Sequence, residues 1–101
     1  MKSIPNLFRK NGIDHVLRKR KGKIALYEQK KGDLSYGYEV HIIRIAKYPT
    51  LRIGKRVKKF PLREILASNE DFGQEGFAFQ TKESAMNKFQ ELIKNQALLN
   101  Y

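Results

Sequence analysis

The chain has 101 residues, which is enough for one domain with a single modest core. It has no cysteine, which excludes disulfides, thiolate-bound metals and a cysteine nucleophile, and no apolar run approaches the roughly 20 residues of a transmembrane helix. Twenty-one Lys and Arg against ten Asp and Glu give a formal net charge of +11, well beyond the magnitude of about 2 to 8 that suits a small domain.

The excess positive charge is concentrated in the first two thirds of the chain. Residues 1–31 carry ten basic and two acidic side chains, residues 32–63 carry eight and two, and residues 64–101 carry three and six. A surface that serves only solubility would mix the two signs along the chain. The bias therefore predicts one basic region on the folded molecule, and such a region attracts polyanions.

The first half of the chain predicts an arm followed by strands. Residues 1–12 are expected to form a basic N-terminal arm, and residues 13–101 a single α+β domain. Alternating or β-branched patterns indicate strands, and segments with glycine indicate turns. The expected strands are Asp14–Arg18, Ile24–Glu28 and Tyr38–Tyr48, joined by turns at Arg20–Lys23 and Lys31–Gly37. The last of these strands is apolar on both faces, which indicates either a bulge or cover on both sides.

The second half predicts a basic strand, a short strand and a long helix. Arg52–Phe60 is expected to be a basic fourth strand, Leu62–Gly73 fits a helical turn followed by a loop, and Gly76–Gln80 predicts a last short strand. Thr81 is a favourable N-cap, and the apolar residues that follow it at helical spacing predict a helix over Lys82–Leu98. The expected fold is α+β: a curled antiparallel sheet of four to five strands with one C-terminal α-helix packed on it.

Residues 71–89 read DFGQEGFAFQTKESAMNKF, and this stretch resembles the C-terminal half of WGR domains. In that family an aromatic-Gly-Arg turn precedes a glycine, a short strand and a helix with Ala and Phe four positions apart, as Ala85 and Phe89 are here. Phe72 stands where the family has Trp, and Gln74 stands where it has Arg. The segment Tyr38-Glu39-Val40 and the segment Asn69–Gly76 are also similar to small uncharacterised bacteriophage proteins. The resemblance implies a small antiparallel sheet with one helix in a protein that binds DNA.

Two basic clusters beside turns, with tyrosines nearby, form the candidate binding surface. Lys and Arg neutralise phosphates and release counterions, and a tyrosine on an open sheet face can stack on an unpaired base. For any single tyrosine, however, the role of an ordinary core or cross-strand residue is favoured. The candidate nucleic-acid-binding residues are Arg18, Lys19, Arg20, Lys21, Lys23, Lys55, Arg56, Lys58, Lys59, Tyr27 and Tyr38.

Catalytic chemistry has less support in the sequence. Asp14 together with the segment Glu28–Lys30 has the acid…Glu-x-Lys form of many metal-dependent nucleases, but a chain this rich in Glu and Lys produces that pattern easily by chance. His15 and His41 show no metal-binding spacing. No catalytic residue, cofactor or metal site is therefore predicted, and the chain is not expected to be an enzyme.

The sequence leads to two hypotheses of different class. The first is a non-enzymatic nucleic-acid-binding module that uses a basic sheet surface and the N-terminal arm and recognises mostly phosphates and shape; DNA and RNA, single- or double-stranded, both fit. The alternative is a small basic regulator or inhibitor that docks on an acidic partner protein. Leu98, Leu99 and Tyr101 could also seal a homodimer. A membrane partner is not expected, and the expected location is the cytoplasm, that of a bacterial host if the chain is phage-encoded.

Overall fold

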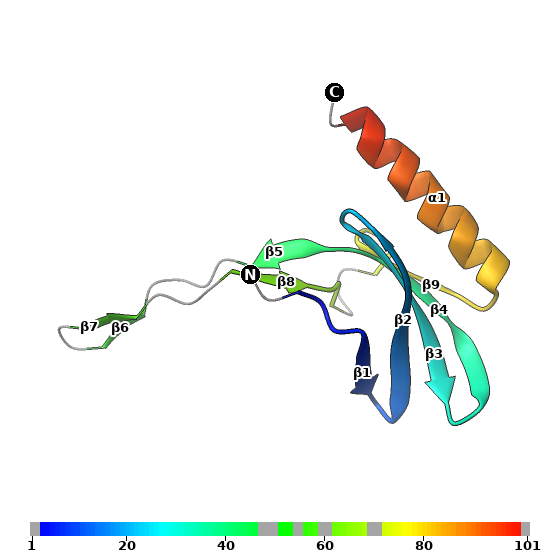
Figure 1. Cartoon of the computed structure of the whole chain (residues 1–101), viewed down its shortest axis with the longest axis horizontal. Coiled ribbons are helices and arrows are strands. Elements are labelled where there is room, and N and C mark those ends of the chain that lie inside the picture. Colours follow the sequence, from blue (N-terminus) through cyan, green and yellow to red (C-terminus); the bar gives the residue numbers. More distant parts are fainter. Residues whose placement is uncertain (1–2, 47–50, 54–55, 59–61, 69–71, 100–101) are drawn as a thin grey trace.

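The computed structural model describes residues 3–46, 51–53, 56–58, 62–68 and 72–99. Its main element is an antiparallel sheet of five strands in the order β1-β2-β3-β4-β9, with one C-terminal helix, α1 (Lys82–Leu99) (Figure 1). The strands of this sheet are β1 (Leu7–Lys10), β2 (Ile13–Lys21), β3 (Ile24–Lys31), β4 (Leu34–Ile42) and β9 (Gly76–Phe79). The α+β fold expected from the sequence is therefore confirmed.

Much of the expected N-terminal arm lies in this sheet. β1 pairs with β2, with Leu7 opposite Val16. The turn between the two strands is Asn11-Gly12, whose φ angles are 55° and 77°. Two successive residues with positive φ give the tight hairpin turn that matches the twist of paired strands, and Asn-Gly is its preferred sequence. Ile4, upstream of β1, is buried, so the segment expected to be an arm contributes to both the sheet and the core.

Apolar side chains pack on both faces of the sheet. On the helix face, which α1 covers, Ile24, Leu26 and Val40 pack against Ala85 and Phe89 of the helix. On the opposite face lies a second buried cluster, made of Ile4, Ala25, Tyr27 and Ile43. Successive residues of β3 alternate between the two clusters, because side chains of a strand point to opposite faces in turn. β3 is thus buried on both sides.

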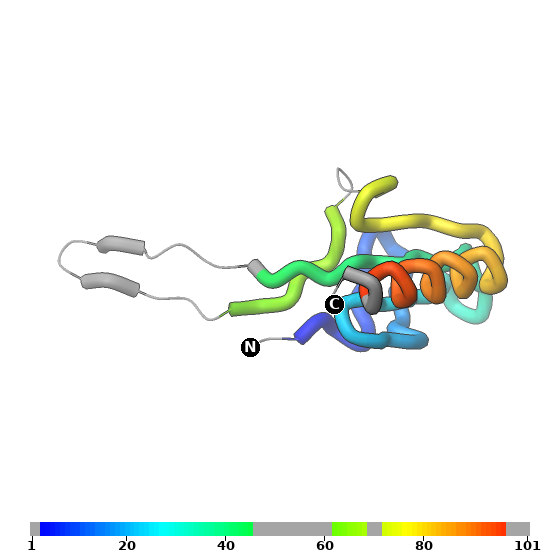
Figure 2. Tube along the Cα trace, turned by 90° about the horizontal axis from the view of Figure 1, so that it is seen from above, coloured from blue at the N-terminus to red at the C-terminus, as the bar shows by residue number. Residues whose placement is uncertain are grey.

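The helix α1 begins directly after Thr81. The Thr81 Oγ1 accepts a hydrogen bond from the Ser84 N–H at 3.2 Å, which satisfies one of the free N–H groups at the helix start. An apolar stripe that includes Ala85 and Phe89 then packs on β3, β4 and β9. Figure 2 shows α1 running along the sheet. The helix expected over Lys82–Leu98 is confirmed and is one residue longer.

Four further short strands form two separate pairs. β5 (Arg44–Ala46) pairs with β8 (Arg63–Ile65), and β6 (Leu51–Ile53) pairs with β7 (Arg56–Lys58) (Figure 1). The expectation of a single strand over 52–60 is wrong, because its described part belongs to two antiparallel strands. The strand β8 lies where the sequence suggested a helical turn and a loop, and its pairing with distant β5 explains why a local pattern did not reveal it.

The long strand expected over 38–48 is divided in the structure. β4 already starts at Leu34, four residues earlier than expected, and ends at Ile42; after Ile43 the chain continues as β5. Cover on both sides applies to β4, since Val40 faces α1 and His41 is buried on the opposite face. β4 also has a register shift against β3 at Tyr36, ahead of the range expected from the sequence. Within the described part of the chain, no helix combines the length and the apolar character that crossing a membrane requires.

Candidate nucleic-acid interface

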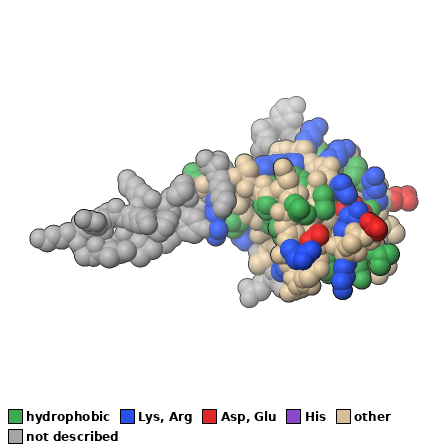
Figure 3. Space-filling model, turned by 60° about the horizontal axis from the view of Figure 1, so that its bottom comes forward, with side chains coloured by type: hydrophobic (Ala, Val, Ile, Leu, Met, Phe, Trp, Pro, Cys, Tyr) green, Lys and Arg blue, Asp and Glu red, His purple; other side chains and the backbone are tan. Residues whose placement is uncertain are grey.

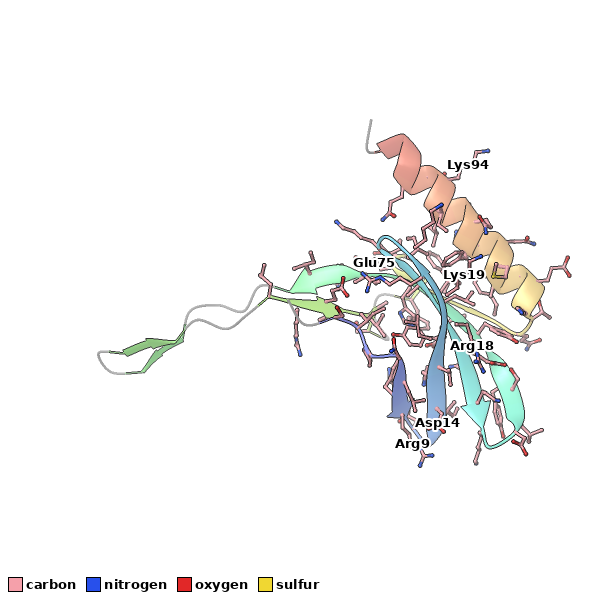
Figure 4. The ribbon with its side chains drawn as sticks, in the orientation of Figure 1. Arg9, Asp14, Arg18, Lys19, Glu75 and Lys94 are labelled. Carbon is pink, nitrogen blue, oxygen red and sulfur yellow. The ribbon has the colours of Figure 1, made fainter. Side chains whose placement is uncertain are left out.

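The basic run Arg18–Lys21 lies in the second half of β2, where the strand carries a β-bulge. Leu17 pairs with Tyr27 of β3, but Lys19 pairs with the adjacent Leu26, which leaves Arg18 as an extra residue. A bulge of this kind changes the direction of side chains relative to a regular strand. As a consequence, Arg18 and Lys19 line the same cavity on the helix face although they are neighbours in the sequence. Figure 4 labels both residues.

Arg18 is paired with a carboxylate of the next strand. Its Nη2 lies 2.8 Å from Glu28 Oε1, and the Tyr38 hydroxyl donates to Glu28 Oε2 at 3.3 Å. Burial alone would raise the pKa of Glu28, but hydrogen bonds from Ser35, Arg18 and Tyr38 together lower it. Glu28 is therefore ionised at neutral pH and balances the charge of Arg18.

Arg20 is paired with Glu64 on the opposite face of the sheet. Its Nη1 and Nη2 donate to the two carboxylate oxygens at 2.7 and 2.5 Å, and the Ile4 N–H donates to Oε1 at 3.2 Å. The hydrogen bonds from Arg20 are the largest reason why the pKa of Glu64 lies below its ordinary value. This bidentate pair connects β2 to β8, so Arg20, a candidate ligand contact, already has a structural partner.

The lysines of the first cluster are exposed to solvent, as Arg18 and Arg20 are, but among the described residues they form no ion pair with a carboxylate. Lys19 lies on β2 with its Nζ 5.6 Å from the centre of the Phe89 ring of α1. Lys21 ends β2, and Lys23 belongs to the β2–β3 turn; both are exposed. A lysine is a flexible point charge with three donors, which suits contacts with phosphates better than readout of base edges.

The two candidate tyrosines occupy different environments. Tyr27 is 0% exposed, and its hydroxyl donates to the Pro5 carbonyl at 2.6 Å. Burial raises its pKa to about 12. A ring enclosed in this way cannot offer a face to a base, so the interpretation of Tyr27 as a stacking residue is corrected: it is a core residue. Tyr38 is half-buried and lines the cavity with Arg18.

The second basic cluster falls largely outside the described residues. Lys55 and Lys59 lie outside them, and of Arg56 and Lys58 the structure describes only the backbone, in β7. The C-terminal side chains proposed to seal a homodimer are also outside the described part. The candidate site is therefore built from the first cluster and its surroundings.

The cavity on the helix face adds residues that the sequence analysis did not single out. It has a volume of about 320 Å³ and lies between the sheet and the start of α1; its lining consists of Arg18, Lys19, Leu26, Glu28, Tyr38, Lys82 and Met86. Lys82 and Met86 come from α1, far along the chain from the first cluster. The capped helix start at Thr81 fixes where α1 begins, but only the packing of α1 on the sheet brings Lys82 to the same cavity as Lys19.

The opposite face contains a buried polar network, and His15 and Glu39 of this network also line a smaller cavity of about 110 Å³. Glu39 Oε1 lies 3.2 Å from His41 Nε2 and 3.4 Å from His15 Nε2. The Ala67 N–H donates to His41 Nδ1 at 3.2 Å, so Nε2 carries the proton and donates to Glu39. In the described ranges, no set of three or more His, Asp or Glu side chains is arranged to hold a metal ion. The network satisfies polar groups inside the fold.

Acidic side chains of the described residues are largely engaged in ion pairs within the molecule. The pairs are Arg9–Asp14, Arg18–Glu28, Arg20–Glu64, Arg44–Glu75 and Lys88–Glu91. On the face of the molecule that Figure 3 shows, Lys and Arg side chains are spread over the described residues, and fewer Asp and Glu side chains lie among them. Each ion pair neutralises one acidic and one basic side chain. The charged side chains of the described residues that remain outside these pairs are therefore mostly basic.

Comparisons of this chain with protein-family models, with curated proteins and with solved structures find no match.

Proposed function

We propose that the chain is a non-enzymatic nucleic-acid-binding module that uses the basic surface around the bulge of β2 and the β2–β3 turn. The observation that carries the proposal is the net charge of +11 in a molecule whose described acidic side chains are mostly paired internally. Exposed lysines at Lys19, Lys21 and Lys23 then meet the phosphates. Contacts of this type release counterions, which favours binding at low salt.

The test is fluorescence anisotropy with labelled single-stranded DNA, duplex DNA and RNA over a series of salt concentrations. We expect binding whose logarithm falls linearly with the logarithm of the salt concentration. An unrelated folded protein of equal net charge serves as the reference. Binding no tighter than that of the reference would contradict the proposal and would favour the alternative, a basic face that docks on an acidic protein.

A pair of matched variants tests the assigned surface. Lys21→Gln with Lys23→Gln removes two charges at the β2–β3 turn, whereas Lys31→Gln with Lys94→Gln removes two exposed charges elsewhere. We expect the first pair to reduce the salt slope by about 0.7–0.9 for each lost phosphate contact and the second pair to change it little. Equal losses in both variants would show that total charge, rather than this surface, governs binding.

A further inference from the structure

The cavity on the helix face has the size and the composition of a small binding site. Its volume of about 320 Å³ is at the lower end of the roughly 300–1,000 Å³ typical of ligand pockets. Its lining combines an apolar part, formed by Leu26 and Met86, with the half-buried ring of Tyr38. A planar group of modest size would find both apolar contact and an aromatic neighbour there.

The charges around the cavity favour an anionic group attached to that planar part. Arg18 is balanced by Glu28, but among the described residues neither Lys19 nor Lys82 forms an ion pair. The lining therefore has two lysines left over after the internal pair. Lys82 is the first residue of α1, where the helix dipole adds a positive contribution that Glu83 in the same turn partly offsets.

The β-bulge in β2 is a second, independent indication that this cavity is built for binding. In a regular strand Arg18 and Lys19 would point to opposite faces. The extra residue turns both to the helix face, at the cost of interrupting the strand ladder. Bulges occur preferentially where a strand has to aim a side chain, including beside binding sites.

We propose that this cavity takes one unpaired base of a single-stranded nucleic acid, with the neighbouring phosphates on Lys19 and Lys82. This inference rests on the proposed nucleic-acid-binding function and makes it more specific. A base in a duplex is stacked and paired, so it cannot enter a pocket, whereas an unpaired base exposes its face to Tyr38 and to Met86. The cavity thus gives the basic surface a preference for single strands.

The decisive experiment compares the affinities for a short single strand and for the matching duplex, each by anisotropy at one salt concentration. The variant is Lys19→Gln with Lys82→Gln, and the control is Lys31→Gln with Lys94→Gln, which removes the same charge away from the cavity. We expect the wild type to prefer the single strand by about tenfold or more, because each stacked base contributes on that scale. The cavity variant loses the phosphate contacts that flank the bound base, so it should weaken single-strand binding more than duplex binding and reduce this preference, and the control should keep it.

A second comparison removes the aromatic contact without changing the charge. Tyr38→Ala should weaken single-strand binding by about tenfold and leave duplex binding unchanged, whereas Tyr36→Ala, an exposed position on the same strand, should change neither. Circular dichroism shows whether the Tyr38→Ala variant is folded at the assay temperature. If it is not, the lysine variants, whose side chains are exposed, decide the question.

The experiment distinguishes failure of the proposed function from failure of the cavity site. A wild type that binds no nucleic acid overturns the proposed function together with the cavity site. A wild type that binds single strands and duplexes equally, with equal losses in both lysine variants, leaves the proposed function in place and overturns the cavity site.

Discussion

Arginine and lysine differ in their contacts in this molecule, although both carry one positive charge. Arg9, Arg18 and Arg20 each form an ion pair with a carboxylate of the same chain. A planar guanidinium with several donors fits a carboxylate well, whereas a lysine is a hydrated point charge on a flexible stem. The clearest example is Arg20, which binds both oxygens of Glu64. Of these described arginines and the lysines near them, it is therefore mainly the lysines whose charge is available to a ligand, and lysines favour contacts with phosphates over base readout.

Tyr27→Phe tests the corrected role of a candidate residue. Loss of the hydrogen bond to the Pro5 carbonyl should lower the free energy of unfolding at pH 7 by about 1 kcal/mol, measured by urea denaturation. Affinity for nucleic acid should not change, because the ring is enclosed. Weaker binding with unchanged stability would instead show that Tyr27 contacts the ligand.

The raised pKa of Tyr27 adds a pH dependence to the same comparison. Burial raises the pKa to about 12, above its ordinary value of 10, so the folded state favours the neutral phenol. The unfolded chain loses this proton first, so the contribution of Tyr27 is complete below pH 10 and is lost as the pH rises toward 12. Tyr27→Phe should make the loss of stability over this range shallower.

At the level of elements, the pair Arg20–Glu64 connects β2 of the large sheet with β8. Hydrogen bonds from Arg20 and from the Ile4 N–H lower the pKa of Glu64 below its ordinary 4.5. A lowered pKa means that the carboxylate stabilises the fold above pH 4.5 and ceases to do so as the pH falls through the lowered value. Glu64→Gln should therefore cost about 1 kcal/mol at pH 7 and reduce the loss of stability between neutral and acid pH.

The control for this prediction is Glu91→Gln. Glu91 pairs with Lys88 on α1, but its side chain is 57% exposed, and exposed pairs contribute little. Urea denaturation at several pH values measures both variants. An equal effect of the two substitutions would show that Glu64 is an ordinary surface carboxylate and does not connect the two sheets.

The elements themselves could be predicted where local patterns determine them. Thr81 with the apolar stripe behind it predicts α1, and the alternation after Lys23 predicts β3. Asn11-Gly12 is an equally local hairpin signal, and it could have revealed β1. The bulge at Arg18 has no such signal, because it depends on how β2 pairs with β3.

The same distinction explains how much of the candidate site was predictable. Arg18 and Lys19 belong to a run of basic residues that is visible in the sequence. Lys82 joins them only because α1 packs across the sheet, and Glu28 is found as the partner of Arg18 only through strand register. Contacts between residues far apart in the chain follow from tertiary packing, which local patterns do not contain.

For the molecule as a whole, the important question is whether a ligand recognises the fold or only the charge. The unfolded chain has the same net charge of +11 and also attracts polyanions. Folding, however, brings Lys19 and Lys82 to one cavity and uses Glu28 and Glu64 in internal pairs. A ligand that depends on this arrangement binds the folded state better, whereas purely electrostatic attraction acts on both states.

Thermal unfolding with added single-stranded nucleic acid separates the two cases. If the ligand binds only the folded state, a concentration of 100 times Kd adds about 2.7 kcal/mol of stability, which should raise Tm by roughly ten degrees or more for a chain of this length. Binding to the unfolded chain would diminish or cancel the rise. Lys19→Gln with Lys82→Gln should abolish most of the rise, and Lys31→Gln with Lys94→Gln should retain it. An unchanged or lowered Tm of the wild type would mean that charge alone, and no arrangement produced by folding, attracts the ligand.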